Sequence, residues 1–108
     1  MCGIAGIVDD TMSAEGMRGA LNSMTDAMEH RGPDDSGFHI RPGIGLGMRR
    51  LSIIDVEGGR QPISNEDGTV VVVCNGESYN YQELTDELVG LGHKFSTASD
   101  VEVIAHLY

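Results

Sequence analysis

Residues 44–48 alternate large apolar side chains with glycine, in the order Ile-Gly-Leu-Gly-Met. A two-residue alternation is typical of a β-strand, because successive side chains of a strand point to opposite faces of its sheet. We therefore predict a strand with one apolar face and one nearly bare face. The segment does not match the GxGxxG pattern of a dinucleotide-binding loop, since Met48 occupies the position of the third glycine.

The chain before this strand is predicted to contain a first strand at residues 4–8 and then an amphipathic helix. Apolar side chains recur in the helix at spacings of four, three and four residues, at Met17, Leu21, Met24 and Met28. These spacings place them on one face. We expect that face to lie in the core, because methionine fills irregular gaps between packed side chains. Gly32-Pro33 is expected to end the helix.

The C-terminal half is predicted to continue the alternation of strands and helices, with short strands at residues 51–54, 70–74 and 93–98. Four valines precede Cys74, so we expect this strand and its thiol to be buried. Two helices are also expected. The first has Asn80 and Glu83 as caps and an apolar face at Leu84, Leu88 and Leu91. The last helix opens with a capping box at Ser99 and Glu102.

The last predicted helix begins an apolar face near the end of the sequence, at Val101, Ile104, Ala105 and Tyr108. No C-cap residue follows it. Natural domains rarely stop inside the buried face of a helix, so we expect residues 1–108 to be part of a longer domain.

Composition excludes several classes of partner. The 108 residues carry 17 acidic and 7 basic side chains, a net charge of −10 that repels nucleic acids and anionic membrane surfaces. The longest apolar run is far shorter than the about 20 residues of a membrane-spanning helix. No basic segment precedes MCGIAGIVDD at the start of the chain, so that stretch is not expected to be a secretory signal. Two cysteines do not make a disulfide framework, and free thiols favour a cytoplasmic location.

Cys2 directly follows the initiator methionine. Removal of Met1 would leave Cys2 with both a thiol, of reference pKa about 8.5, and a free α-amine, of reference pKa about 7.7–8.0. One residue would then supply a nucleophile and a proton acceptor near neutral pH, which is the N-terminal form of base-assisted nucleophilic catalysis. The alternative interpretation is a cysteine of no catalytic role at the start of the first strand.

Four motifs follow Cys2 in a fixed order: HRGPDDSG, RRLSIID, CNGESYN and SDVEVI. Together they resemble the N-terminal glutaminase domain of asparagine synthetases, which are class II glutamine amidotransferases with an N-terminal nucleophile. The resemblance covers the whole chain. It implies an α+β fold, the four-layer αββα sandwich of N-terminal nucleophile hydrolases, incomplete in residues 1–108. Two departures are Ser78, where the family usually has isoleucine, and Met48 before the arginine pair.

The resemblance implies that the chain hydrolyses glutamine to glutamate and ammonia. Cys2 would be the nucleophile, and Asn75 and Gly76 would form the oxyanion hole. Taken alone, Asn75-Gly76 also matches the two-residue turn of a β-hairpin.

A second group of residues would hold the glutamine. The resemblance assigns Arg50 to its α-carboxylate, Asp100 to its α-ammonium group, Glu77 as support, and the Ile53 backbone to a position beside it; Asn75 also counts among the glutamine-binding residues. Arg49 would point to the opposite face of the strand and lie at the solvated surface.

The remaining histidines do not predict a metal site. His39, His93 and His106 are scattered without paired spacing, so no metal is expected. His30 and Arg31 match the HRGPD signature, which we interpret as structural support near the active site.

The resemblance also implies a C-terminal synthetase domain, outside these residues, that would use the ammonia to amidate aspartate. That domain would require ATP and magnesium, whereas residues 1–108 are expected to bind no cofactor. Homodimerisation is left open. The alternative functions are another class II amidotransferase, forming glucosamine phosphate or phosphoribosylamine, and a glutamine-binding module without chemistry. The module would be expected to lack Cys2.

Overall fold

The computed structural model describes residues 2–51 and 59–108. It is a mixed α+β structure with two small antiparallel sheets. The first sheet has the strand order β1-β3-β2, formed by β1 (Gly3–Val8), β2 (Asp35–Arg41) and β3 (Ile44–Arg50). The second sheet pairs β4 (Ile63–Ser64) with β5 (Val71–Val72). No helix of the described residues is long and apolar enough to cross a membrane.

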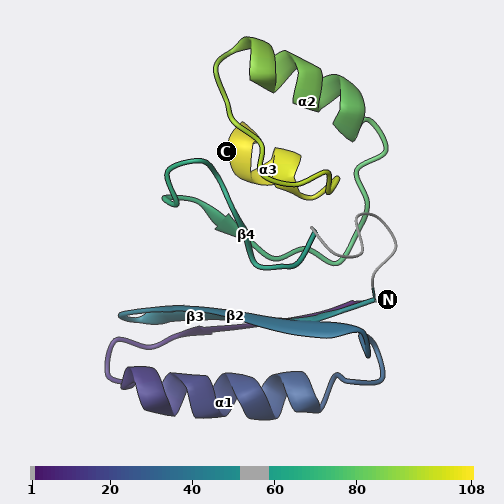
Figure 1. Cartoon of the computed structure of the whole chain (residues 1–108). Helices are drawn as coiled ribbons and strands as arrows, with labels where there is room; N and C mark the ends of the chain where they lie inside the picture. Colours follow the sequence, from purple (N-terminus) through teal and green to yellow (C-terminus); the bar gives the residue numbers. More distant parts are fainter. Residues whose placement is uncertain (1, 52–58) are drawn as a thin grey trace.

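The described residues also form three helices: α1 (Ala14–Asp26), α2 (Tyr81–Gly90) and α3 (Glu102–Leu107). Figure 1 shows α1 against one face of the three-stranded sheet, while β4, α3 and α2 lie on the opposite side of that sheet. The order along this direction is therefore helix, sheet, sheet, helix.

The glycine-bearing face of β3 is the face against which α1 packs. A Cβ atom built on Gly45 would lie 2.7 Å from Met17 Sδ and 2.8 Å from Leu21 Cδ1. One on Gly47 would lie 2.9 Å from Thr25 Cγ2. The bare face predicted from the alternation of residues 44–48 is confirmed, and it lets the helix approach the sheet closely.

Helix α1 confirms the predicted element but only part of its buried face. Met17 and Leu21 are buried, whereas Met24 is 39% exposed. Thr25 is buried instead and satisfies its hydroxyl by donating to Leu21 O at 2.9 Å. The helix also ends at Asp26, before Met28 and before the predicted stop at Gly32-Pro33. The observed buried face therefore consists of Met17, Leu21 and Thr25, each four residues after the one before. The predicted face had a spacing of three between Leu21 and Met24.

Several predictions for the C-terminal half are wrong. The strand expected at residues 70–74 is reduced to β5, whose valines are only half-buried, because the two-residue β4 pairs with it. Residues 93–98 are irregular, with a bend at Ser96, rather than a strand. The strand expected at residues 51–54 does not include Leu51, and the rest of it lies outside the described residues.

The two later helices also differ from expectation in their caps and apolar faces. In α2 only Leu88 is buried, Leu91 is 73% exposed, and the Asn80 side chain makes no cap hydrogen bond. The predicted capping box of α3 is wrong: the Glu102 carboxylate accepts hydrogen bonds from the backbone of Ser96 and Thr97, at 2.8 Å each, instead of returning to Ser99. These preceding backbone N–H groups lie inside the fold, where an unpaired donor is costly.

Candidate active site

A pocket of about 370 Å³ opens between the three-stranded sheet and the segments that follow β5. Small-molecule sites in proteins typically have volumes of about 300–1,000 Å³. The pocket brings together all the described residues predicted for the site: Cys2, Arg50, Asn75, Gly76, Glu77 and Asp100. The remaining one, Ile53, lies outside the described residues.

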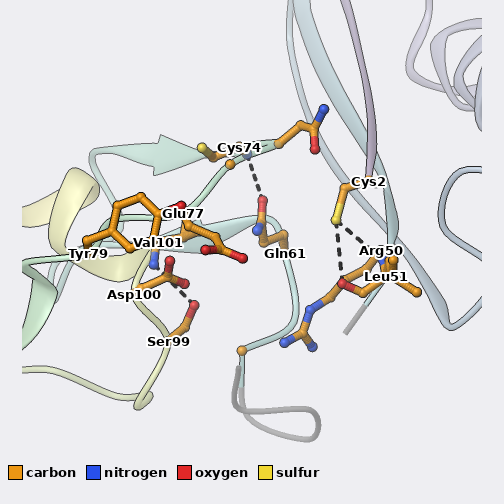
Figure 2. Close-up of a pocket in the computed structure, with 13 residues that line it drawn as sticks. Cys2, Arg50, Leu51, Gln61, Cys74, Glu77, Tyr79, Ser99, Asp100 and Val101 are labelled. Atoms are coloured by element: carbon orange, nitrogen blue, oxygen red, sulfur yellow. Dashed lines mark hydrogen bonds between the residues drawn. The ribbon is translucent and has the colours of Figure 1, made fainter. Parts of the chain in front are cut away.

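Cys2 is fixed beside the end of β3 by the pairing of β1 with β3. Its sulfur accepts a hydrogen bond from Leu51 N at 3.3 Å and lies 3.7 Å from Leu51 O (Figure 2). Arg31 Nε donates to Cys2 O at 3.1 Å. Arg31 therefore supports the start of the chain, in keeping with the role expected of the HRGPD signature, while His30 is exposed.

Charges of opposite sign line opposite sides of the pocket. Figure 2 shows Cys2 and Arg50 on one side, with Glu77 and Asp100 on the other. Arg50 and Asp100 are each only 5% exposed. A ligand with a carboxylate at one place and an ammonium group at another, as in a free amino acid, suits this arrangement.

Asp100 is held in place by the NGESYN segment. Its Oδ2 accepts a hydrogen bond from Ser78 N at 2.8 Å. The backbone of Ser78 makes this bond, so the replacement of the family's isoleucine leaves it unaffected. Met48, the other departure, is fully buried in the core.

Asn75 and Gly76 form a bend at the edge of the pocket. Both residues are exposed and line the pocket. The chain then continues into α2 instead of pairing with a second strand, so the alternative of a hairpin turn is wrong. Cys74 N, immediately before the bend, donates to Gln61 Oε1 at 2.7 Å. That hydrogen bond positions the bend relative to the pocket.

Cys74 is half-buried and lines the pocket, so its predicted full burial is wrong. Partial burial raises the pKa of its thiol, and the negative charges of Asp100 and Cys2 raise it further. The valines before it belong to a strand that is itself only half-buried. Cys74 is thus held as the neutral thiol, a weak nucleophile.

Arg49 points to the α1 side of the sheet, as the strand alternation predicts, but its placement at the solvated surface is wrong. Its side chain is 13% exposed, and its Nε donates to Gly32 O at 3.0 Å. The terminal nitrogen Nη2 of Arg49 lies 3.7 Å from Glu29 Oε1. The turns that follow α1 fold back against β3 and cover this arginine.

Sequence reasoning missed Gln61 and Tyr79, which also line the pocket. Gln61 comes from the segment before β4, and a Cβ atom on Gly37 of β2 would collide with its backbone oxygen. This close approach needs a glycine. The only local signal for Gln61 is the proline that follows it.

The histidines are not all scattered, contrary to the sequence-based interpretation. The rings of His93 and His106 meet edge to face, with centroids 5.3 Å apart, at a place outside this pocket.

Comparison with known proteins identifies the class of molecule that has this fold and pocket. The sequence model of the family described as "Glutamine amidotransferase domain" matches residues 1–108, the whole chain. The chain belongs to this family, which implies an N-terminal nucleophile hydrolase fold.

Individual relatives are more specific. The chain is 50% identical over 110 residues to "Asparagine synthetase [glutamine-hydrolyzing] 2" of Bacillus subtilis and 45% identical over 108 residues to "Asparagine synthetase [glutamine-hydrolyzing] 2" of rice, Oryza sativa. Both matches cover 100% of this chain. The chain spans 14% and 18% of the length of these relatives, respectively.

Proposed function

We propose that this chain is the N-terminal part of a glutaminase domain that hydrolyses the side-chain amide of glutamine to glutamate and ammonia. The observation that carries the proposal is the pocket in which Cys2 lies with one buried cation and one buried anion. Membership of the glutamine amidotransferase family supports the same substrate.

In the proposed mechanism, Arg50 binds the α-carboxylate of glutamine, and Asp100 with Glu77 binds its α-ammonium group. These contacts place the side-chain amide beside Cys2. The Cys2 thiolate attacks the amide carbon, and the developing oxyanion accepts hydrogen bonds from the Asn75 side chain and Gly76 N–H. The Ile53 backbone and the Asn75 side chain are further proposed contacts to glutamine.

The C–N bond then breaks and ammonia leaves with a proton delivered through the α-amine of Cys2, once Met1 has been removed. The remaining thioester is hydrolysed by water, which releases glutamate and restores the thiol. Cys74 lines the same pocket, but its raised pKa keeps it from competing as a nucleophile.

For the whole protein, we propose a glutamine-hydrolysing asparagine synthetase, because the relatives named above carry that name. Residues 1–108 would contribute the first part of a four-layer αββα sandwich, in keeping with the order of layers in Figure 1. A C-terminal domain would bind ATP, magnesium and aspartate, and would use the ammonia. The names of these relatives favour this function over the formation of glucosamine phosphate or phosphoribosylamine.

Cys2→Ala in the whole protein tests the proposal. We expect glutaminase activity, measured as glutamate release, to fall by about 10³-fold or more. Glutamine binding, measured by calorimetry, should persist, since Arg50 and Asp100 remain. Asparagine synthesis from added ammonia should also persist, because it does not need the thiol.

Cys74→Ala is the matched control, since it removes the other thiol of the pocket and should retain turnover. Glutaminase activity that survives Cys2→Ala would contradict the role of Cys2. An equal fall in ammonia-dependent synthesis would contradict the assignment of two separate sites.

A further inference from the structure

Three potential metal ligands converge at a place distinct from the pocket of Cys2. Glu66 lies in the turn between β4 and β5, His93 follows α2, and His106 lies in α3. One ligand atom from each residue lies within 4.8 Å of the other two. Glu66 Oε1 is 3.0 Å from His93 Nδ1, and Glu66 Oε2 is 2.6 Å from His106 Nδ1. None of the three lines the pocket of Cys2.

His106 is buried and oriented by a second carboxylate. Its side chain has no exposed surface, and its Nε2 lies 3.1 Å from Glu102 Oε1. Glu102 is itself fixed by backbone N–H groups of Ser96 and Thr97. The contact with Glu102 fixes the imidazole ring so that Nδ1 faces Glu66.

His106 Nδ1 has no hydrogen-bond partner among the described residues, even though it is fully buried. Its 2.6 Å contact with Glu66 Oε2 falls outside hydrogen-bond geometry. Two carboxylates thus flank the His106 ring, Glu66 at Nδ1 and Glu102 at Nε2. Their negative charge favours a positive charge in the cluster, carried either by a ring proton or by a metal ion.

The backbone holds the two exposed members of the cluster in position. His93 N donates to Leu88 O and Gly92 N donates to Val89 O, a Schellman motif with Gly92 at φ 102°. The turn that carries Glu66 is closed by Asn65 Oδ1, which accepts from Val70 N at 3.1 Å. The side chains of His93 and Glu66 are about one-third exposed, so an ion can reach them from solvent.

We propose that Glu66, His93 and His106 form a zinc site that joins the β4–β5 turn, the end of α2 and helix α3. Two imidazoles and one carboxylate are a ligand set that zinc uses, with water in the fourth position. Magnesium and calcium prefer oxygen ligands and fit the two imidazoles poorly. Glu102 would act on His106 as the outer carboxylate that orients a metal-binding imidazole.

Zinc entry requires a small rearrangement. Ligand atoms of a tetrahedral zinc site lie about 3.3 Å apart when each is about 2.0–2.1 Å from the metal. The present contacts of Glu66 are shorter, so its partly exposed side chain must move outward.

Zinc binding to the whole protein, stripped of metal with a chelator, tests this proposal. We expect wild type to bind one zinc ion per chain at this site in calorimetry. His93→Ala and Glu66→Gln should each remove this binding event. Glu102→Gln should weaken it by about 10–100-fold, because it removes the outer carboxylate. His30→Ala is the matched control, since His30 is exposed in the turns that follow α1 and is not among the clustered ligands, and it should bind like wild type.

Cobalt substitution identifies the ligands independently. Bound Co²⁺ should show the visible spectrum of a tetrahedral nitrogen–oxygen site, without the charge-transfer band of a thiolate, and His93→Ala should abolish it. Circular dichroism confirms that each variant is folded. Zinc binding that survives both His93→Ala and Glu66→Gln, or that Cys2→Ser abolishes, overturns the proposal. A wild-type protein that binds no zinc at this site overturns it as well.

Discussion

At the scale of single residues, two cysteines share one pocket but have different surroundings. Cys2 receives a hydrogen bond from Leu51 N, while Cys74 lies near the buried Asp100. Burial and the negative charge of Asp100 favour the neutral form of Cys74. Position in the fold, rather than residue type, therefore separates a proposed nucleophile from an inert thiol.

Alkylation of Cys74 by iodoacetamide should reveal its raised pKa. Only the thiolate reacts, so Cys74 should be labelled slowly at neutral pH, and its rate should rise only above the ordinary thiol pKa of about 8.5. Asp100→Asn removes a nearby negative charge and should move this rise to lower pH. Mass spectrometry of the Cys74 peptide measures both profiles. Labelling at neutral pH as fast as that of free cysteine would contradict the assignment.

At the scale of elements, the glycines of the first sheet set how closely other parts of the chain approach it. Gly45 faces side-chain ends of α1, whereas Gly37 faces the backbone oxygen of Gln61 on the opposite side. Side-chain ends adjust more readily than backbone. The two faces of the sheet should therefore differ in their tolerance of an added methyl group.

Alanine substitutions test this difference by thermal unfolding of the whole protein. Gly45→Ala overpacks the contact with Met17 and Leu21, and overpacking typically costs about 1–3 kcal/mol. Gly37→Ala should lower the melting temperature more, because the backbone of Gln61 must move. Gly19→Ala in α1 is the control: its Cβ would have no neighbour within 4 Å, and it should stabilise the helix by up to about 1 kcal/mol. Equal melting temperatures for the first two variants would refute this ranking.

Elements with a strong local period could be predicted from the sequence. Strands β1 and β3 and helix α1 follow their apolar spacing, because that spacing marks the face that each element packs against its neighbours. The strands predicted at residues 70–74 and 93–98 failed because strand formation requires a partner, and partners are not visible in local sequence. Glu102 was assigned to a cap, but its carboxylate pairs with backbone groups that only the folded chain brings near.

The pocket was predictable to the extent that its residues belong to motifs. Cys2, Arg50 and Asp100 come from three motifs, and the fold brings them together as the family resemblance implied. Gln61 belongs to no motif that we recognised, and its function in positioning Cys74 depends on a contact between distant segments. The convergence of His93 and His106 was equally invisible, because the two residues lie 13 positions apart in the sequence.

At the scale of the whole molecule, the three-stranded sheet is covered unequally. The face toward α1 is packed, whereas three apolar side chains on the opposite face remain exposed, although Met48 on that face is buried: Ile4 is 48% exposed, Ile44 42% and Val8 83%. Polar contacts link the two sheets, including a hydrogen bond from Arg41 to Gly68 O at 3.2 Å. Folding leaves a margin of only about 5–15 kcal/mol, so an uncovered apolar face matters.

Residues 1–108 expressed alone should therefore be poorly folded and without glutaminase activity, although they contain every residue of the proposed site. The incomplete cover of the sheet is the physical reason. Two-dimensional NMR and a glutaminase assay on this segment measure the two properties, with the whole protein as the control. A well-dispersed spectrum together with turnover would show that residues 1–108 suffice as a domain.

The antiparallel pairing of β1 with β3 also has a consequence in time. Gly3 pairs with Arg49, so a nascent chain must grow by on the order of forty residues beyond β1 before that strand finds its partner, a few seconds at about 5–20 residues per second. The proposed chemistry of Cys2 requires that Met1 be removed. Removal of Met1 during these seconds would act on a chain whose first strand is still unpaired.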